Sequence, residues 1–215
     1  KVGKFGVGLL NIQSDSEPVT ATPSTNFSVV RVKRDILRKS TVGAMFTSRS
    51  ASNVTPGAGN QVFGVDGAFG FHENLTIGGY YAKTWTEGLN GDDDSFQGRF
   101  DYFADRYGAR FEYLDVGDDF NPEVGFLSRR GYRKPDIRLM TRFRPADFLD
   151  LHELRPHSSY RAFYGFDGLL ESSHWHIDNH WQFRNSYEIH TGMNVIKEGV
   201  RRAFPIFPGV IVPPG

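Results

Sequence analysis

Hydrophobic and polar residues alternate along most of this sequence with the period of two that is typical of β-strands. The clearest case is a pair of segments, "SFQGRFDYFA" (95–104) and "RYGARFEYLDV" (106–116), which follow each other almost directly. In the first, Phe100 lies on one side of the predicted strand, and Arg99 and Asp101 lie on the other. Two such segments with a short link predict a β-hairpin.

Eleven segments of the chain share this alternation and are predicted as strands. They cover residues 4–13, 26–36, 40–49, 61–71, 75–85, 95–104, 106–116, 136–144, 159–170, 173–183 and 187–195. Over the first seven, long and short connections alternate in order. The long loops lie near 14–25, 51–60, 87–95 and 117–135. This rhythm is typical of a transmembrane barrel, with short turns on one rim and longer loops on the other.

The later connections depart from this rhythm. "PADFLDLHELRPHS" (145–158) predicts a long connection where a short turn is due, and "ESS" (171–173) predicts a short one where a long loop is due. "DFLDLHEL" (147–154) is predicted to form at most one or two turns of helix. The closing "FPGVIVPPG" predicts no regular element.

Two all-β architectures fit the alternation. In a soluble sandwich or barrel the apolar side faces the core, whereas in an outer-membrane barrel it faces lipid and the charged side lines the lumen. Aromatic residues near strand ends favour the membrane, because interfacial girdles need them there. They are Tyr80, Tyr81, Trp85, Tyr102, Tyr107, Tyr113, Trp175 and Trp181. Small residues on both sides of the strands and mixed signs on the charged side point the same way.

The sequence therefore predicts an antiparallel, up-and-down outer-membrane β-barrel, with residues 1–215 as a single domain. Eleven strands is an odd number, whereas single-chain bacterial barrels usually have an even one. We therefore expect an incomplete part of a larger barrel, given as an excerpt or a processed chain. The runner-up is a soluble all-β carbohydrate-binding or hydrolytic domain.

Composition narrows the partners. The chain has 25 Lys and Arg against 25 Asp and Glu, so its formal charge is zero and no nucleic-acid partner is predicted. It has no cysteine, which excludes disulfides and thiolate metal sites. No apolar run approaches the ~18 residues of a membrane-spanning helix. The basic stretch "RVKRDILRKS" (31–40) is interpreted as a lumenal strip or a lipid contact near a rim.

Several segments resemble a known bacterial family, the membrane-associated barrel called domain of unknown function 5916. The resemblance rests on "FGVGLLNIQ", "PSTNFSVVRVKRDIL", "STVGAMFTSRS", "FGVDGAFGFHENLTIGGYYAKT", "DRYGARFEYLDVGDDFNPEVGFLSRRGYR" and "FPGVIVPPG". It implies a bacterial outer-membrane location and a family-9-type carbohydrate-binding domain upstream of the barrel. It implies no catalytic set.

The charged side of the strands supplies the candidate lumen lining. The residues are Arg99, Asp101, Arg110, Glu112, Arg138 and Arg142. Mixed signs on one side suit a wet pore, and Arg138, Arg142 and Arg144 would favour anionic solutes. The predicted partners are thus the lipid bilayer and carbohydrate or anionic small solutes, with the oligomeric state left open.

Histidines gather in "SHWHIDNHWQFRNSYEIHTGMNV" (173–195). His174 and His176 lie on one side of a predicted strand, ~6.6 Å apart along it, and Asp178 or His190 can supply a further ligand for Zn²⁺ or Cu²⁺. His174, His176 and His190 are the metal candidates. The alternative is a polar lumen wall of hydrated histidines, since no helical metal motif is present.

Two acidic loops and one long connection complete the candidates. "NGDDDS" (90–95) and "DVGDDFN" (115–121) offer oxygen ligands of the kind Ca²⁺ takes, without EF-hand spacing. "DVGDDFNPEVGFLSRRGYR" (115–133) is either a constriction folded into the lumen or a surface loop held by its own side chains. No cofactor and no catalytic residue is predicted, and no nucleophile elbow or phosphate-binding glycine motif is present.

Overall fold

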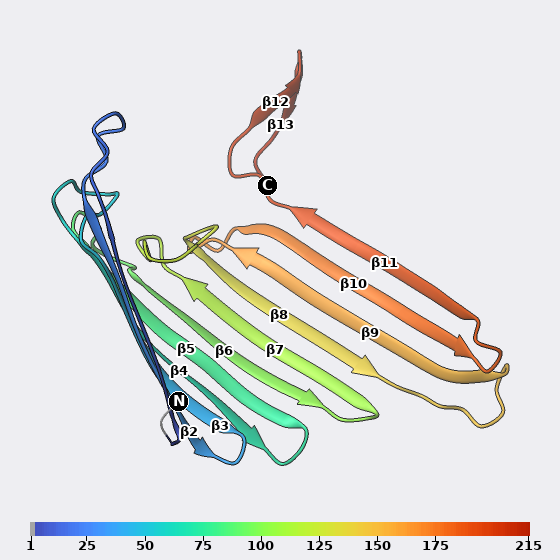
Figure 1. The fold of residues 1–215 in the computed structure, drawn as a ribbon. Coiled ribbons are helices and arrows are strands. Elements are labelled where there is room, and N and C mark those ends of the chain that lie inside the picture. Colours follow the sequence, from blue (N-terminus) through green and yellow to red (C-terminus); the bar gives the residue numbers. More distant parts are fainter. Residues whose placement is uncertain (1–2) are drawn as a thin grey trace. The chain divides into compact units, whose positions relative to one another are not determined.

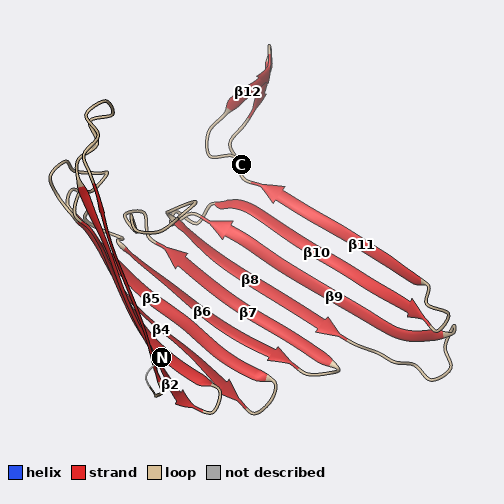
Figure 2. Cartoon of the chain, in the orientation of Figure 1, coloured by secondary structure: helices blue, strands red, loops and turns tan. Residues whose placement is uncertain are grey.

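A computed structural model describes residues 3–215, and every regular element in that range is a β-strand (Figures 1 and 2). The strands are β1 (Phe5–Ser14), β2 (Thr25–Leu37), β3 (Ser40–Arg49), β4 (Asn60–Phe71), β5 (Leu75–Thr86), β6 (Asp94–Phe103), β7 (Tyr107–Val116), β8 (Tyr132–Thr141), β9 (Leu151–Tyr164), β10 (Leu170–Phe183), β11 (Glu188–Glu198), β12 (Phe204–Phe207) and β13 (Val210–Val212). Within residues 3–215 there is no helix with the length and apolarity to cross a bilayer.

The first eleven strands form one sheet whose strand order follows the chain order, β1 to β11. This confirms the predicted all-β, antiparallel, up-and-down arrangement and its eleven strands. β1 and β11 stand at the two ends of this order. The chain divides into two compact units, one running up to Gly98 with Leu114–Tyr132, the other comprising Arg99–Tyr113 with Arg133–Gly215.

In the first unit, the sequence alternation places apolar and polar side chains on opposite faces of the sheet. Val30 pairs with Leu9 and Phe46, and Phe46 pairs with Phe63, so one face carries a row of apolar residues. All four side chains are exposed. On the other face, Arg31 and Asp66 form an ion pair across the sheet.

Several buried side chains of the first unit gather on the polar face and in the loop 117–131. Asn60 and Thr84 are fully buried, and Val62, Val116 and Phe120 are nearly so. Asn60 Nδ2 donates to the backbone oxygen of Asn121 at 2.7 Å, and Thr84 Oγ1 accepts from the Asn121 backbone N–H at 3.1 Å. The long loop is therefore fastened onto the polar side of strands β4 and β5.

The order of long and short connections agrees with the sequence prediction through β8. Residues 38–39, 72–74 and 104–106 are short turns. The longer loops cover residues 15–24, 50–59, 87–93 and 117–131.

The predicted long connection is present, but it covers residues 142–150 rather than 145–158, because β9 already begins at Leu151. "DFLDLHEL" contains no helix. Proline is tolerated inside this strand. Leu154 exchanges backbone hydrogen bonds with Phe143 on the β8 side, so Pro156 also directs its backbone that way. In this register Pro156 stands opposite Thr141, between the Met140–His157 pair and the Phe143–Leu154 bridge, and the β8–β9 ladder is interrupted at that place.

The predicted strand 159–170 and the link at 171–173 are also corrected. β9 ends at Tyr164, the connection covers 165–169, and "ESS" lies within β10. The turn forms where Gly168, with φ of +84°, donates its N–H to the carbonyl oxygen of Gly165. An Asp-Gly pair suits such a turn. The closing segment, predicted to hold no element, forms the β12–β13 hairpin around Gly209.

Candidate functional site

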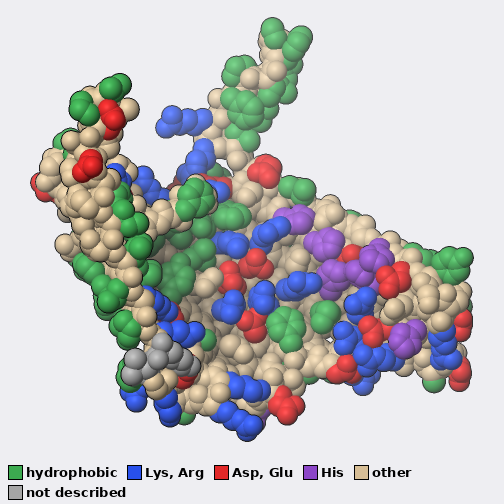
Figure 3. Space-filling view, in the orientation of Figure 1, with side chains coloured by type: hydrophobic (Ala, Val, Ile, Leu, Met, Phe, Trp, Pro, Cys, Tyr) green, Lys and Arg blue, Asp and Glu red, His purple; other side chains and the backbone are tan. Residues whose placement is uncertain are grey.

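The polar face of the second unit gathers most of the charged and histidine side chains predicted to be functional. Antiparallel register places Asp178 opposite His157, and His180 opposite both Arg155 and His190. Paired residues point to the same face of a sheet, so strands β9, β10 and β11 contribute to one polar surface. Figure 3 shows histidines gathered together on the visible face, with basic and acidic side chains beside them.

Four of the six predicted lumen-lining residues lie in ion pairs on this face. Asp101 Oδ2 is 2.8 Å from Arg99 Nε, and its Oδ1 accepts a hydrogen bond from Arg110 Nε at 2.5 Å. Lys134 Nζ lies 3.9 Å from a Glu112 carboxylate oxygen. Asp101 is 8% exposed, so its charge is balanced within the sheet by two arginines.

The fifth, Arg142, belongs to a second network at the turn end of the same strands. Its Nε lies 3.1 Å from Glu153, which also takes Arg144 at 2.9 Å and Arg155 at 3.2 Å. Glu153 is nearly buried. Its single negative charge is shared among three arginines and offsets only part of their positive charge. The sixth, Arg138, lines a polar hollow of about 230 Å³ with Arg110 and Arg161.

The turn residue Asp105 completes this network, and the sequence alone gave no signal for it or for Glu153. Arg144 donates to both Asp105 carboxylate oxygens at 2.7 and 3.0 Å, and Arg142 donates to one at 3.0 Å. The hydrogen bonds from Arg144, with a smaller contribution from Arg142, lower the pKa of Asp105 from 3.8 to about 2.

We expect this turn to lose stability in acid. Because the pKa of Asp105 is lower in the folded than in the unfolded chain, its stabilisation is complete above about pH 3.8 and is lost as the pH falls through about 2. The Asp105→Asn variant should therefore melt below the wild type at pH 7 and together with it at pH 2. A difference in melting temperature that is the same at both pH values would contradict this assignment. Carboxyl NMR of Asp105 gives the pKa directly.

Three metal-ligand side chains converge on the polar face: His157 from β9, and Asp178 and His180 from β10. One ligand atom of each lies within 4.8 Å of the other two. All three side chains are half-buried, and His180 Nε2 is 3.3 Å from an Asp178 carboxylate oxygen. Among residues 3–215 this is the one group of three such ligands, so the acidic loops 90–95 and 115–121 do not form one.

The predicted histidines lie around this group. His176 Nε2 is 3.8 Å from Asp178, and the His190 ring lies against the His180 ring, tilted by 45°, with centroids 3.9 Å apart. Both ring nitrogens of His174 have partners, Arg161 at Nδ1 and Asn194 at Nε2. His157 was missed because it lies in the stretch interpreted as a connection.

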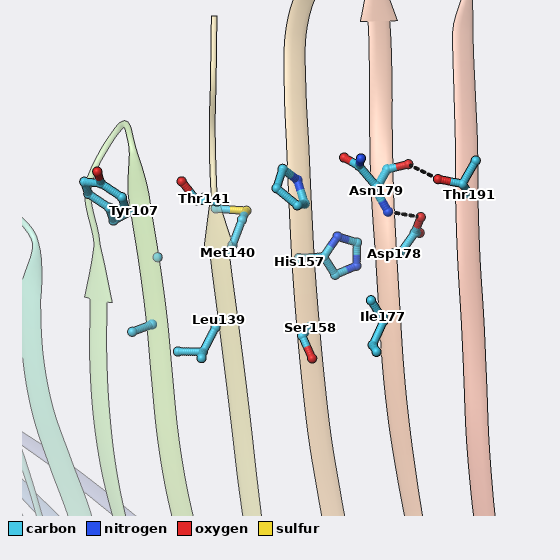
Figure 4. Close-up of a pocket in the computed structure, with 13 residues that line it drawn as sticks. Tyr107, Leu139, Met140, Thr141, His157, Ser158, Ile177, Asp178, Asn179 and Thr191 are labelled. Atoms are coloured by element: carbon cyan, nitrogen blue, oxygen red, sulfur yellow. Dashed lines mark hydrogen bonds between the residues drawn. The ribbon is translucent and has the colours of Figure 1, made fainter.

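The opposite, apolar face of these strands carries a groove of about 750 Å³ (Figure 4). Leu139, Ser158 and Ile177 line it from neighbouring strands, and Ser158 pairs with both of the others. Residues of the polar face such as His157 and Asp178 belong to its floor. This groove therefore lies behind the histidine group, on the other side of the sheet.

In the first unit, Glu123 fixes the long loop that was predicted to be either a constriction or a surface loop. Its carboxylate accepts from Ser52 Oγ at 2.7 Å, the Asn53 N–H at 3.0 Å and Asn121 Nδ2 at 3.0 Å, and pairs with Arg49 at 3.2 Å. The loop thus lies against the polar face rather than away from the sheet.

No family model, curated protein or solved structure matches the chain.

Proposed function

We propose that the chain is part of a bacterial outer-membrane β-barrel of the family it resembles, and that its polar face lines a water-filled, mixed-charge lumen through which small solutes pass. Lipid would cover the apolar face. This reading also gives the long loop 117–131 a role, because a loop fastened onto the polar face would narrow the lumen.

The observation that carries the proposal is the exposure of the apolar face. Large apolar side chains on this face are exposed in both units, whereas the polar face holds the ion pairs and most of the buried residues. They include Leu9, Val30, Phe46, Phe63, Val65, Leu139, Trp175, Ile189 and Met193. A monomer in water rarely exposes so continuous an apolar surface, but a membrane barrel requires one.

Tryptophan contacts on the apolar face support the same reading. Trp175 Nε1 donates to Ser158 Oγ at 2.9 Å, and Trp181 Nε1 donates to Thr191 Oγ1 at 3.2 Å. The indole N–H groups are thus satisfied by hydroxyls of the neighbouring strands. Such internal hydrogen bonds stabilise the fold most in the hydrocarbon core of a bilayer, where water is absent and an unpaired polar group costs several kcal/mol.

The polar hollow indicates the class of solute. Arg110, Arg138 and Arg161 line it against a single carboxylate, Asp136, with His174 beside them. Asp101 already pairs with Arg110, and Lys134 lies 3.6 Å from Asp136, so positive charge exceeds negative charge here. A basic hollow on a pore wall favours anions. Small carboxylates, phosphates or acidic sugars fit this chemistry.

The test begins with full-length protein extracted from isolated cell envelopes. A folded barrel should migrate differently on a detergent gel before and after boiling, and should conduct ions in a planar bilayer with a preference for anions. Replacing Arg138 with Glu should shift the reversal potential toward cation preference. The matched Arg34→Glu variant, on the apolar face beside Phe5, should leave the ion preference unchanged.

Protein that stays soluble without detergent and shows no gel shift would refute the pore. It would favour the soluble carbohydrate-binding or hydrolytic domain instead, with the apolar face turned toward a core. Equal ion preference in the wild type and Arg138→Glu would refute the anionic solute class while leaving the barrel intact.

A further inference from the structure

The ligand atoms of His157, Asp178 and His180 are arranged so that a single metal ion can be bound among them. Tetrahedral coordination at ~2.1 Å separates ligand atoms by ~3.4 Å. The three atoms already lie within 4.8 Å of one another, so side-chain rotations suffice to close the site. His157 and Asp178 are directly opposite each other on β9 and β10 (Figure 4), and His180 is two residues along the same face.

Hydrogen bonds around the group hold His176 in the tautomer that it needs to act as a fourth metal ligand. Arg161 can only donate, so His174 Nδ1 accepts from it at 3.4 Å and the neutral ring carries its proton on Nε2. That N–H donates to Asn194 Oδ1 at 2.9 Å, and His176 Nδ1 donates to the same oxygen at 2.8 Å. Neutral His176 therefore keeps its lone pair on Nε2, the atom that lies 3.8 Å from Asp178.

This arrangement is the one in which metal-binding histidines usually occur. A ligating imidazole typically donates its other ring N–H to a carbonyl or carboxylate oxygen, which fixes the ring and its tautomer. Asn194 does this for His176, and the tilted ring of His190 packs against that of His180. His174, with both ring nitrogens engaged, acts as a positioning residue rather than a ligand.

We propose that His157, Asp178, His180 and His176 form a binding site for a late first-row divalent metal ion, with zinc as the best-suited occupant. Imidazole and carboxylate ligands suit Zn²⁺, Ni²⁺ and Cu²⁺. Ca²⁺ and Mg²⁺ prefer six or more oxygen ligands, which this set does not supply. The site joins β9 to β10 and does not rest on the proposed pore, because its ligands come from local strand pairing.

The test is zinc binding by the full-length protein, purified without a histidine tag and stripped with a chelator. Titration against a chromogenic zinc indicator should give one tight site, and Co²⁺ should give visible absorption bands of a tetrahedral nitrogen and oxygen site. His157→Ala and His180→Ala should each weaken binding at least tenfold. Asp178→Asn, which keeps the shape of the side chain, should do the same.

The matched control is His152→Ala, which removes an exposed histidine from the same strand outside the group. It should bind zinc as the wild type does. Circular dichroism of each variant shows whether the sheet is intact, and a variant that fails to fold is replaced by His157→Gln or His180→Gln. Wild-type binding no tighter than that of the folded His157→Ala or Asp178→Asn protein overturns the proposal, as does an equal loss in His152→Ala. Zinc binding without channel conductance would refute the proposed pore and support the metal site.

Discussion

Replacing Glu123 with alanine is expected to lower the free energy of unfolding by about 3–5 kcal/mol, because it breaks a buried ion pair from one side. The Glu123 side chain is 3% exposed and that of Arg49 is 16% exposed. Without the carboxylate, Arg49 keeps an uncompensated charge, and the donors of Ser52, Asn53 and Asn121 lose their acceptor. Denaturant unfolding followed by tryptophan fluorescence measures the loss.

The same substitution should release the long loop. Limited proteolysis is expected to cut within 117–131 faster in Glu123→Ala than in the wild type, and pore current should rise if the loop narrows the lumen. Phe126→Ala is the matched control, since Phe126 lies on the same loop and is 90% exposed. It should change stability by less than about 0.5 kcal/mol. Equal losses in the two variants would show that the loop is held by something other than the Glu123 contacts.

The sequence predicted the sheet well because strand alternation is a local signal. The segment 61–71 alternates through Phe63, Val65 and Phe69, and it forms most of β4. The predicted strand bounds were wrong where a proline or a turn residue lies in a segment whose structure depends on pairing with another strand. Pro156 lies inside β9 rather than in a connection, at the place where the β8–β9 ladder is interrupted. That interruption depends on where another strand ends, which a local pattern does not contain.

The sequence predicted a histidine-rich site on this face, but it did not predict which residues come together there. Strand alternation alone predicts His174, His176 and Asp178 on one face, and this is their arrangement in the structure. Which histidines meet depends on the register between strands. His157 joins the group because Asp178 pairs with it across β9 and β10. Register is fixed by the 165–169 turn and the neighbouring strands together, so spacing along one strand did not reveal it.

A similar limit applies to the charged residues. Arg99, Asp101, Arg110 and Glu112 were predicted on one face from alternation, and they lie there in ion pairs. Glu153, which gathers three arginines, lies in the misread stretch. The meeting of its carboxylate with Arg142 and Arg144 depends on the fold of the connection 142–150. Long-range charge networks of this kind are decided by tertiary placement, which residue spacing does not encode.

An arginine at Ala44 should be costly in a lipid bilayer, and an arginine at its neighbour Met45 should not. Ala44 lies near the middle of β3 on the apolar face, between Val32 and Val65. A charge on the lipid face near the bilayer midplane costs about 2–4 kcal/mol. Met45 is at the same depth on the polar face, opposite an Arg31 that is already paired with Asp66, so Met45→Arg should cost less than about 1 kcal/mol.

Unfolding of both variants in lipid vesicles decides between the two faces, because the two new arginines are adjacent in the chain, carry the same charge and point to opposite faces of the sheet. Destabilisation by Ala44→Arg alone, in a protein that folds only with lipid or detergent, would place hydrocarbon against the apolar face. A wild type that folds equally well in plain buffer, or equal tolerance of the two arginines in vesicles, would contradict the membrane barrel. The apolar alternation would then belong to a surface in contact with water or with another protein, and the ion-paired face could no longer be assigned to a lumen.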